Sequence, residues 1–185
     1  MAYDGPVPFP GSTGASQVLI KATVLSGAAA SVTFTSVFSN TYNTYRCVFY
    51  NVYPVTDAQD FSIQLVNAGG TITTTYQSGI NAYPYNSATG ANTNSTSLIT
   101  LTGGGQSNVT SNASLCGSLD LFNFPAAINP CIRGMSCFFI SGGTFNLGQI
   151  VATNSSHNTI TGMIFSYASG NIASGTFLLY GIVEA

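Results

Sequence analysis

Charge is the scarcest property of this 185-residue sequence. Charged residues make up 4% of the chain, whereas an average soluble domain carries roughly a quarter. The three cations are Lys21, Arg46 and Arg133, which are too few to neutralise a run of phosphates. Binding to nucleic acid through phosphates and binding to an anionic membrane both require a basic cluster, so we expect neither. A net charge of −2 gives weak colloidal repulsion, and we expect the chain to associate.

Long apolar runs are also missing. No stretch approaches the roughly 20 apolar residues of a membrane-spanning helix, and Met1–Pro6 lacks the regions of a signal peptide. We therefore expect synthesis in a cytoplasm, where thiols stay reduced. Cys47, Cys116, Cys131 and Cys137 form no C-x-x-C pair, which disfavours a zinc site. We interpret the cysteines as small buried hydrophobic residues; the alternative is a Cys131–Cys137 disulfide formed after release from the cell.

Groups for acid–base catalysis are few. The one histidine is His157, and a Ser/His/Asp triad would require folding to bring it to Asp57, Asp60 or Asp120. No G-x-S-x-G motif supports such a triad. Asp57 and Asp60 are interpreted as turn residues that cap backbone N–H groups, with a calcium site as the alternative. Glycoside hydrolysis would need two of the three aspartates within about 5–10 Å. We expect no enzymatic activity, no catalytic residue, no metal and no cofactor.

What the sequence does contain is the pattern of a β protein. Thr, Val, Ile, Phe and Tyr dominate, no window shows convincing 3.6-residue periodicity, and Lys, Glu and Arg are nearly absent. Short apolar or alternating runs are bounded by Gly, Asn, Pro or Ser. They predict an all-β domain over residues 18–185, an antiparallel two-sheet sandwich that is jelly-roll-like. The predicted strands cover 32–35, 46–52, 61–66, 71–76, 119–121, 132–140, 160–166 and 176–182.

Glycine and asparagine mark the turns and loops. Asn67–Gly70 predicts a hairpin turn, because glycine adopts positive φ at little cost. Asn81–Ser114 is interpreted as long surface loops around a short strand at Leu98–Leu101. Aromatic residues among Asn, Ser and Gly suit adaptable recognition surfaces and subunit interfaces. The expected partner contacts therefore include four tyrosines in loop-like contexts: Tyr42, Tyr45, Tyr83 and Tyr85.

Residues 1–17 are predicted to form an extended arm. Pro6, Pro8 and Pro10 remove backbone donors and favour extended or polyproline geometry, so this segment cannot lie inside a sheet. The arm could instead lie along another protein and present Val7 and Phe9 as anchors. The alternative is a floppy terminus without a partner.

The segment Ile160–Ile182 carries a familiar pattern. A strand ends in Ser169–Asn171, and Ser174–Thr176 then leads a final strand to Leu179–Ile182. This segment resembles the closing strands of small β-structured virion proteins of tailed bacteriophages, and Leu119–Asn123 is similar to a middle strand of that family. The resemblance implies a jelly-roll-like sandwich, often trimeric, that is exposed on the virion. The cytoplasm expected above as its place of synthesis would then be that of the host.

Two functions follow from the resemblance. The first is that of a capsid-decoration or cement protein, a homotrimer that stabilises the head lattice while its arm grips the major capsid protein. The second is that of a receptor-binding tip of a tail or head fibre, whose loops touch a host surface glycan. The length of the chain and its arm lead us to expect the first.

Deletion of residues 1–17 should weaken attachment far more than folding. Because proline alternation excludes this segment from the sheet, the truncated protein should keep nearly the melting temperature of the full chain. Its incorporation into particles should fall, because Val7 and Phe9 are lost. Thermal unfolding and the amount of protein in purified particles measure the two effects. A truncated chain that fails to fold would show that the arm belongs to the core.

Overall fold

The computed structural model describes residues 17–87, 89–102, 114–124, 126–140, 143–156 and 158–183. These residues form two antiparallel β-sheets, and no helix occurs among them. Accordingly, no helix in these ranges has the length and apolarity needed to cross a membrane. The predicted all-β, two-sheet antiparallel sandwich is confirmed, and its jelly-roll-like order stays a prediction.

The larger sheet has eight strands, and each pairs antiparallel with its neighbours. Across the sheet they are ordered β1 (Gln17–Leu25), β13 (Ile172–Ile182), β3 (Thr44–Pro54), β9 (Leu115–Phe122), β10 (Cys131–Phe139), β11 (Phe145–Asn154), β6 (Tyr76–Pro84) and β7 (Ala91–Ser95). The consecutive strands β9, β10 and β11 form a meander, while the first and last strands of the chain pair with each other.

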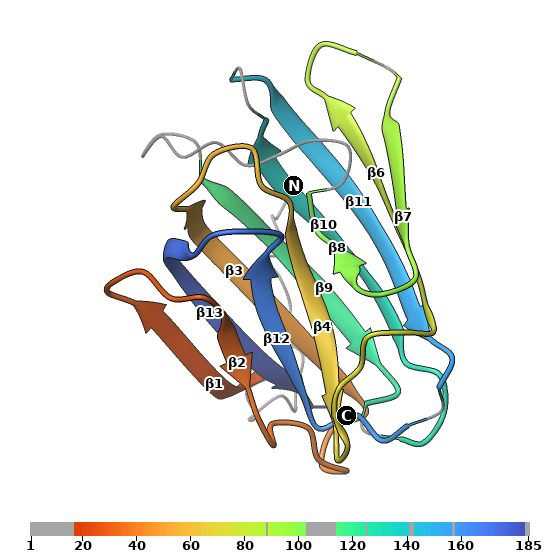
Figure 1. The fold of residues 1–185 in the computed structure, drawn as a ribbon. Helices are drawn as coiled ribbons and strands as arrows, with labels where there is room; N and C mark the ends of the chain where they lie inside the picture. The colour runs from red at the N-terminus through yellow and green to blue at the C-terminus, as the bar shows by residue number, and fades with distance from the viewer. Residues whose placement is uncertain are drawn as a thin grey trace, which may run out of the picture.

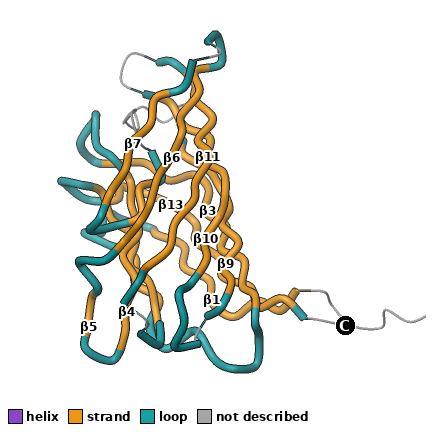
Figure 2. Tube along the Cα trace, turned by 90° about the vertical axis from the view of Figure 1, so that its right-hand side faces the viewer, coloured by secondary structure: helices purple, strands orange, loops and turns teal. Residues whose placement is uncertain are grey.

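The smaller sheet has five strands and covers one face of the larger one. They are β2 (Val32–Phe34), β12 (Gly162–Tyr167), β4 (Phe61–Asn67), β5 (Gly70–Thr71) and β8 (Ile99–Thr100), which pairs with β4. Figure 1 shows β2, β12 and β4 in front of the large sheet. In the turned view of Figure 2, β4 and β5 lie to the left of β11, β10 and β9, so the two sheets form separate layers.

A cluster of aromatic rings fills the space between the sheets. Phe49 and Phe177 enter it from β3 and β13 of the large sheet, and Phe61 and Phe165 enter from β4 and β12; all four are fully buried. The ring centroids of Phe165 and Phe177 are 5.0 Å apart, within the range of attractive ring pairs. Because these side chains remove large apolar areas from water, the cluster is a main source of the stability of the sandwich.

Small residues on the inner face of the large sheet make room for this core. Gly117, Ser136 and Gly148 are direct neighbours across β9, β10 and β11. A Cβ atom on Gly117 would lie 2.5 Å from the Phe49 ring, and one on Gly148 would lie 2.5 Å from the Ile80 side chain. Glycine at these positions therefore serves close packing, since a larger side chain would displace the core.

Two buried hydroxyl groups join the sheets by hydrogen bonds. The Tyr76 hydroxyl, on β6, accepts a hydrogen bond from the Leu65 N–H of β4 at 2.7 Å and donates one to the Ile72 carbonyl at 3.0 Å. Burial raises the pKa of Tyr76 to about 12, so its hydroxyl stays protonated at neutral pH. The Ser136 hydroxyl donates to the Leu101 carbonyl at 2.6 Å. Such paired groups in a dry interface fix the position of one sheet against the other.

Strands lie where the sequence predicted loops. β6 and β7 occupy most of residues 76–95, so the interpretation of Asn81–Ser114 as long loops around one short strand is wrong in this part. β7 is an edge strand of polar residues that stay in contact with water, and it therefore needs no apolar alternation. The sequence pattern also missed β1 and β11, whereas β8 confirms the short strand expected near Leu98–Leu101.

The hairpin turn predicted at Asn67–Gly70 is confirmed. It joins β4 to β5, and Gly70 adopts the predicted positive φ, with a value of 110°. The Asn67 side chain accepts a hydrogen bond from the Gly69 N–H at 2.8 Å, which closes the turn. β5 is shorter than predicted and ends at Thr71.

The predicted arm meets the sandwich at its first strand. β1 begins at Gln17, which pairs with Ile182 and was assigned to the arm by the sequence pattern. Residues 1–16, with the predicted anchors Val7 and Phe9, lie outside the described residues.

Gly134→Ala should destabilise the sandwich by about 1–3 kcal/mol, the usual cost of overpacking a filled core. A Cβ atom at Gly134 would lie 2.2 Å from the Ser118 carbonyl oxygen, which belongs to the backbone of β9 and cannot move aside cheaply. Gly27→Ala is the matched control, because nothing lies within 4 Å of a Cβ atom there. Urea denaturation measures both variants, and equal loss of stability in the two would contradict the packing described.

Candidate functional site on the outer face of the large sheet

The outer face is the face of the large sheet that points away from the small sheet. Because successive side chains of a strand point to opposite faces of the sheet, every second residue lies on the outer face. On β10, Arg133 and Met135 point outward while Ile132 and Ser136 are buried. Large apolar side chains remain exposed on it, with 65% of Val151 and 49% of Met135 accessible to solvent. Exposed apolar side chains gathered on one face of a sheet favour its use as an interaction surface. Its exposed apolar members are Leu19, Val24, Tyr50, Met135, Phe145 and Val151.

A row of three charged residues crosses β3, β9 and β10 on the outer face, two residues from the end of each of these strands. Arg46 on β3 and Arg133 on β10 are both register partners of Asp120 on β9. The Arg46 guanidinium donates to Asp120 Oδ1 through Nε and Nη2, each at 2.8 Å. Arg133 Nε lies 3.5 Å from Asp120 Oδ2, and its guanidinium lies over the Phe122 ring, 5.2 Å from the centroid. Asp120 thus holds Arg46 by hydrogen bonds and forms a longer ion pair with the more exposed Arg133. We call these three residues the charged row.

The charged row is better suited to recognition than to stabilisation. It holds two of the three cations of the chain and one of its five carboxylates, so its net charge is +1. Exposed ion pairs contribute about 0–1 kcal/mol each to folding. The Arg133 side chain is 70% exposed, and its planar fork of donors matches a carboxylate or a pair of carbonyl groups on a partner.

Three shallow depressions meet at the charged row. Their volumes are about 360, 340 and 240 Å³, and Arg133 lines all three while Asp120 lines two. Open depressions of this size accept single side chains of a partner surface, the arrangement found around interface hot spots. Other residues that line them are Thr44, Phe122, Met135, Gln149, Val151 and Ile182.

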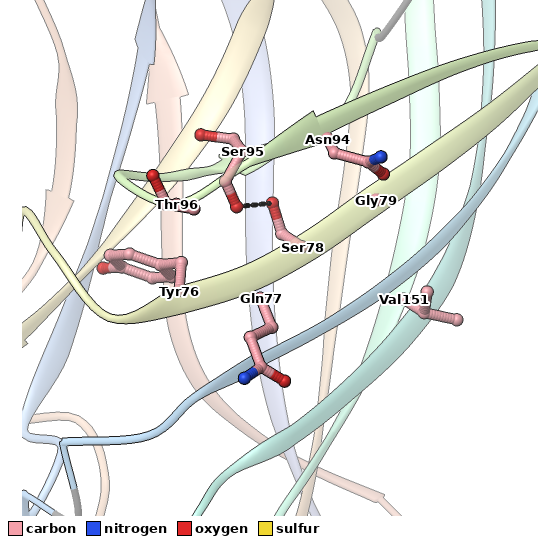
Figure 3. A pocket seen from close by; sticks show the side chains of 8 residues that line it. All are labelled: Tyr76, Gln77, Ser78, Gly79, Asn94, Ser95, Thr96 and Val151. Carbon is pink, nitrogen blue, oxygen red and sulfur yellow. Dashed lines mark hydrogen bonds between the residues drawn. The ribbon is translucent and has the colours of Figure 1, made fainter.

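A fourth depression, of about 490 Å³, lies beside the edge strand β7. Figure 3 shows the Ser78 hydroxyl pointing toward the Ser95 carbonyl, to which it donates at 3.3 Å, and Gln77 on the other side of β6. A Cβ atom at Gly79 would lie 2.9 Å from Asn94 Oδ1, so the glycine leaves room at this point. The lining offers amides and hydroxyls but no carboxylate, histidine or cysteine, so it favours neutral hydrogen bonding over catalysis.

Aromatic side chains gather at one end of the outer face. Phe139 and Phe145 face each other across β10 and β11, with ring centroids 5.2 Å apart. The Tyr85 N–H donates to the Phe145 carbonyl at 3.0 Å, and 74% of Tyr85 is exposed. Tyr83 is half-buried on β6. We call these four residues the aromatic end.

The structure separates the four tyrosines predicted as partner contacts. Tyr83 and Tyr85 belong to the aromatic end, where Tyr85 is exposed as expected. Tyr42 is half-buried, because its ring lies against Gly181, where a Cβ atom would come within 2.5 Å of it. Part of the Tyr42 ring is therefore committed to packing inside this chain.

Tyr45 is fully buried, so its interpretation as an exposed loop residue is wrong. β3 begins at Thr44, one residue earlier, and its alternation turns Tyr45 inward in phase with Cys47 and Phe49. The Tyr45 hydroxyl accepts a hydrogen bond from the Ser39 N–H at 2.8 Å and donates one to the Ser39 carbonyl at 2.7 Å. Its polar group is thus satisfied within the chain.

The aspartates considered for catalysis lie in two different places. Asp57 and Asp60 lie in the connection between β3 and β4, where a turn was predicted, whereas Asp120 belongs to the charged row. That the two side chains cap backbone N–H groups stays a prediction. Asp60 Oδ1 accepts a hydrogen bond from the Thr102 hydroxyl at 3.3 Å. Burial raises the pKa of Asp60, and the hydrogen bond from Thr102 opposes this effect. The Thr102 hydroxyl in turn accepts a hydrogen bond from the Phe61 N–H at 2.7 Å.

Groups that could hold a metal ion are not assembled in the part of the chain that the structure describes. No three His, Cys, Asp or Glu side chains come together there. The calcium site considered at Asp57 and Asp60 would take its remaining ligands from carbonyl groups, so this finding does not test it. His157, the one histidine, lies outside them.

The cysteines differ in burial. Cys47 is fully buried, as predicted, and burial raises the pKa of its thiol far above the usual range. Cys116 and Cys131 are exposed and Cys137 is half-buried, so the buried interpretation is wrong for the exposed pair. The Cys131–Cys137 disulfide is also wrong. Six positions along one strand correspond to about 20 Å, whereas a disulfide needs Cα atoms within about 7 Å.

No protein-family model matches this chain, and no curated protein matches it. Function is therefore inferred from the outer face and from the sequence pattern of the closing strands.

Asp60→Asn should change how stability depends on pH. Because burial raises the pKa of Asp60 in the folded state, the folded protein binds the proton more tightly than the unfolded chain does. The ionised carboxylate therefore weakens the fold above the folded pKa, and this penalty is relieved as pH falls toward the ordinary aspartate pKa of 3.8. Asparagine keeps an acceptor for Thr102 without the charge.

Denaturation at neutral and at mildly acidic pH measures the difference between Asp60→Asn and the unmodified chain. The stability advantage of the variant should be largest at neutral pH and should shrink as pH falls. A difference that does not change with pH would contradict the burial of the ionised Asp60 carboxylate.

Proposed function

We propose that this chain is a non-enzymatic structural protein of a tailed-phage virion that acts by contact, with capsid decoration as its role. The observation that carries the proposal is the outer face, an exposed and largely apolar sheet surface with a charged row on its central strands. Catalysis needs titratable groups positioned together in a cleft. The described aspartates instead serve a turn and an ion-pair row, which supports a role in contact.

The outer face has the composition of a protein–protein interface. Such interfaces are enriched in aromatic residues, Met and Arg and are depleted of Lys and Glu. Tyr50, Met135 and Arg133 lie exposed on this face. We assign the face to neighbouring copies of the same chain, because a net charge of −2 gives little repulsion between copies and the exposed apolar area gains by being covered.

A homotrimer on the head lattice is the arrangement we propose, following the resemblance of Ile160–Ile182 to small virion proteins. This segment forms β12 and β13, which contribute Phe165 and Phe177 to the core. The residues that carry the resemblance thus form the scaffold itself. The major capsid protein is the second proposed partner, contacted by the N-terminal arm. A protein of this kind stabilises a capsid by adding contacts between its subunits.

A receptor-binding tip of a tail or head fibre is the second candidate, and the aromatic end favours it. Tyr85 is largely exposed beside Phe145 and is followed by Asn86 and Ser87. Exposed tyrosine among small polar residues supplies contact area at low entropic cost together with adaptable hydrogen bonds. A host surface glycan would be the partner. A particle reconstruction that places the chain on the head lattice supports decoration, and one that places it at a fibre tip supports receptor binding.

Light scattering at micromolar concentration should find a trimer, and Val151→Lys should weaken it. The substitution places a charge at a 65% exposed position on the outer face, where a partner would have to desolvate it. Val55→Lys is the matched control, since Val55 is also exposed (53%) but lies in the connection between β3 and β4.

Light scattering of the unmodified chain, Val151→Lys and Val55→Lys distinguishes three cases. A trimer that is lost in Val151→Lys and kept in Val55→Lys supports the outer face as the subunit interface. A trimer kept in both variants would remove the outer face from the interface. A well-behaved monomer of the unmodified chain would overturn the oligomer itself.

A further inference from the structure

Two cysteines from different strands face each other on the large sheet. Cys116 on β9 and Cys137 on β10 are direct register partners in an antiparallel ladder. Directly opposed residues in such a ladder have Cα atoms about 4.5–5.5 Å apart, and disulfides span Cα distances of about 4.4–6.8 Å. Both cysteines share the outward phase of their neighbours Ser118 and Met135, so both sulfur atoms project from the outer face.

We propose that Cys116 and Cys137 are a modification site, a dithiol that disulfides of small thiols, the class of oxidised glutathione, convert to an intramolecular cross-strand disulfide. The backbone already holds the two residues within bonding distance, so the reaction needs side-chain rotation rather than movement of the strands. Cys116 is exposed and Cys137 half-buried in the single chain, so an oxidant in solution reaches this pair wherever no partner covers this part of the outer face.

The reaction proceeds in two exchange steps. The Cys116 thiolate attacks one sulfur of the small disulfide, which forms a mixed disulfide and releases one thiolate of the small thiol. The Cys137 thiolate then attacks the Cys116 sulfur and releases the second small thiolate. The protein loses two electrons and two protons, and one small disulfide becomes two small thiols.

The surroundings of the two sulfur atoms determine which cysteine reacts first with the oxidant. Burial, and after it the neighbouring Cys116 sulfur, raise the pKa of the Cys137 thiol, so Cys137 holds its proton more tightly than an exposed thiol. Because the thiolate is the nucleophile, the exposed Cys116 is the residue that meets the oxidant. Cys137 acts second, when the mixed disulfide lies directly across the ladder from it.

The other two cysteines have no such partner in the ladder. Cys131 is exposed on the same strand and the same face as Cys137, but its register partners are Phe122 and Thr153. It can form only a mixed disulfide or a bond to another molecule. Cys47 is fully buried and therefore out of reach of the oxidant. Cys131 is thus an internal control for exposure without a facing thiol.

Trypsin digestion after oxidation tests the site. The native full chain is treated with oxidised glutathione, free thiols are alkylated, and peptides are mapped by mass spectrometry without reduction. Arg133 lies between the two cysteines, so cleavage there places Cys116 and Cys137 in different peptides that remain joined only by a disulfide. We expect this joined pair in the unmodified chain and in Cys131→Ser, and its loss in Cys116→Ser and Cys137→Ser. The oxidised protein should also melt roughly 5–10 °C higher than the reduced one.

Several results would overturn the proposal. The same oxidation is run on Val151→Lys, whose outer face is open even if copies of the unmodified chain cover it. Absence of the joined peptides in both proteins overturns the proposal, as does their loss in Cys131→Ser. A stable glutathione adduct at Cys116 that never passes to Cys137 overturns it as well. The urea-unfolded chain should give mixed pairings, so equal selectivity in urea would show that the fold does not direct the bond.

Discussion

The dry aromatic interface between the two sheets is the constraint on which the rest of the structure depends. Phe49 contacts Phe61 and Phe165 of the small sheet, with ring centroids 6.2 and 6.5 Å apart. It can do so because Gly117 beneath it carries no side chain. In such an interior a polar group without a hydrogen-bond partner is costly. The Tyr76 hydroxyl avoids this cost because it pairs with the Leu65 N–H of the other sheet. Most of the inner face of the large sheet is thereby committed to the core, and its outer face is available to partners.

The same constraint explains where the charges lie. A dry core excludes ions, so Arg46, Asp120 and Arg133 all occupy outward positions of their strands. Antiparallel register then brings the three into one row, although Arg46 and Asp120 are far apart in sequence. Around this row the outward residues are apolar or neutral, so a partner that covers it meets few other charges to desolvate. A surface of this kind favours stable contact over solubility of the separate chain.

The sequence predicted those parts of the fold whose residues alternate or form short apolar runs. β4 alternates, whereas β3, β12 and β13 contain nearly continuous apolar runs, and the existence of these strands follows from the two patterns. β7 could not be predicted in this way, because a solvent-exposed edge strand does not require apolar residues at alternate positions. Tyr45 was predicted to be an exposed loop residue because the predicted strand began one residue later, at position 46. In the structure Tyr45 lies inside β3, where the alternation of side chains points it toward the core. The charged row and the Cys116–Cys137 pair depend on register between strands, which one-dimensional periodicity does not contain.

Register also relates the two sites proposed on the outer face. Asp120 and Cys116 lie four positions apart on β9, which corresponds to about 13 Å along the strand. A partner side chain held by the charged row therefore need not cover the dithiol, whereas a partner that lies along the whole of β9 would. The rate at which Cys116 reacts thus reports how far a bound partner extends over the sheet. Conversely, a disulfide between β9 and β10 would stiffen the two strands that carry Asp120 and Arg133, so it would hold the charged row in the arrangement that a partner meets.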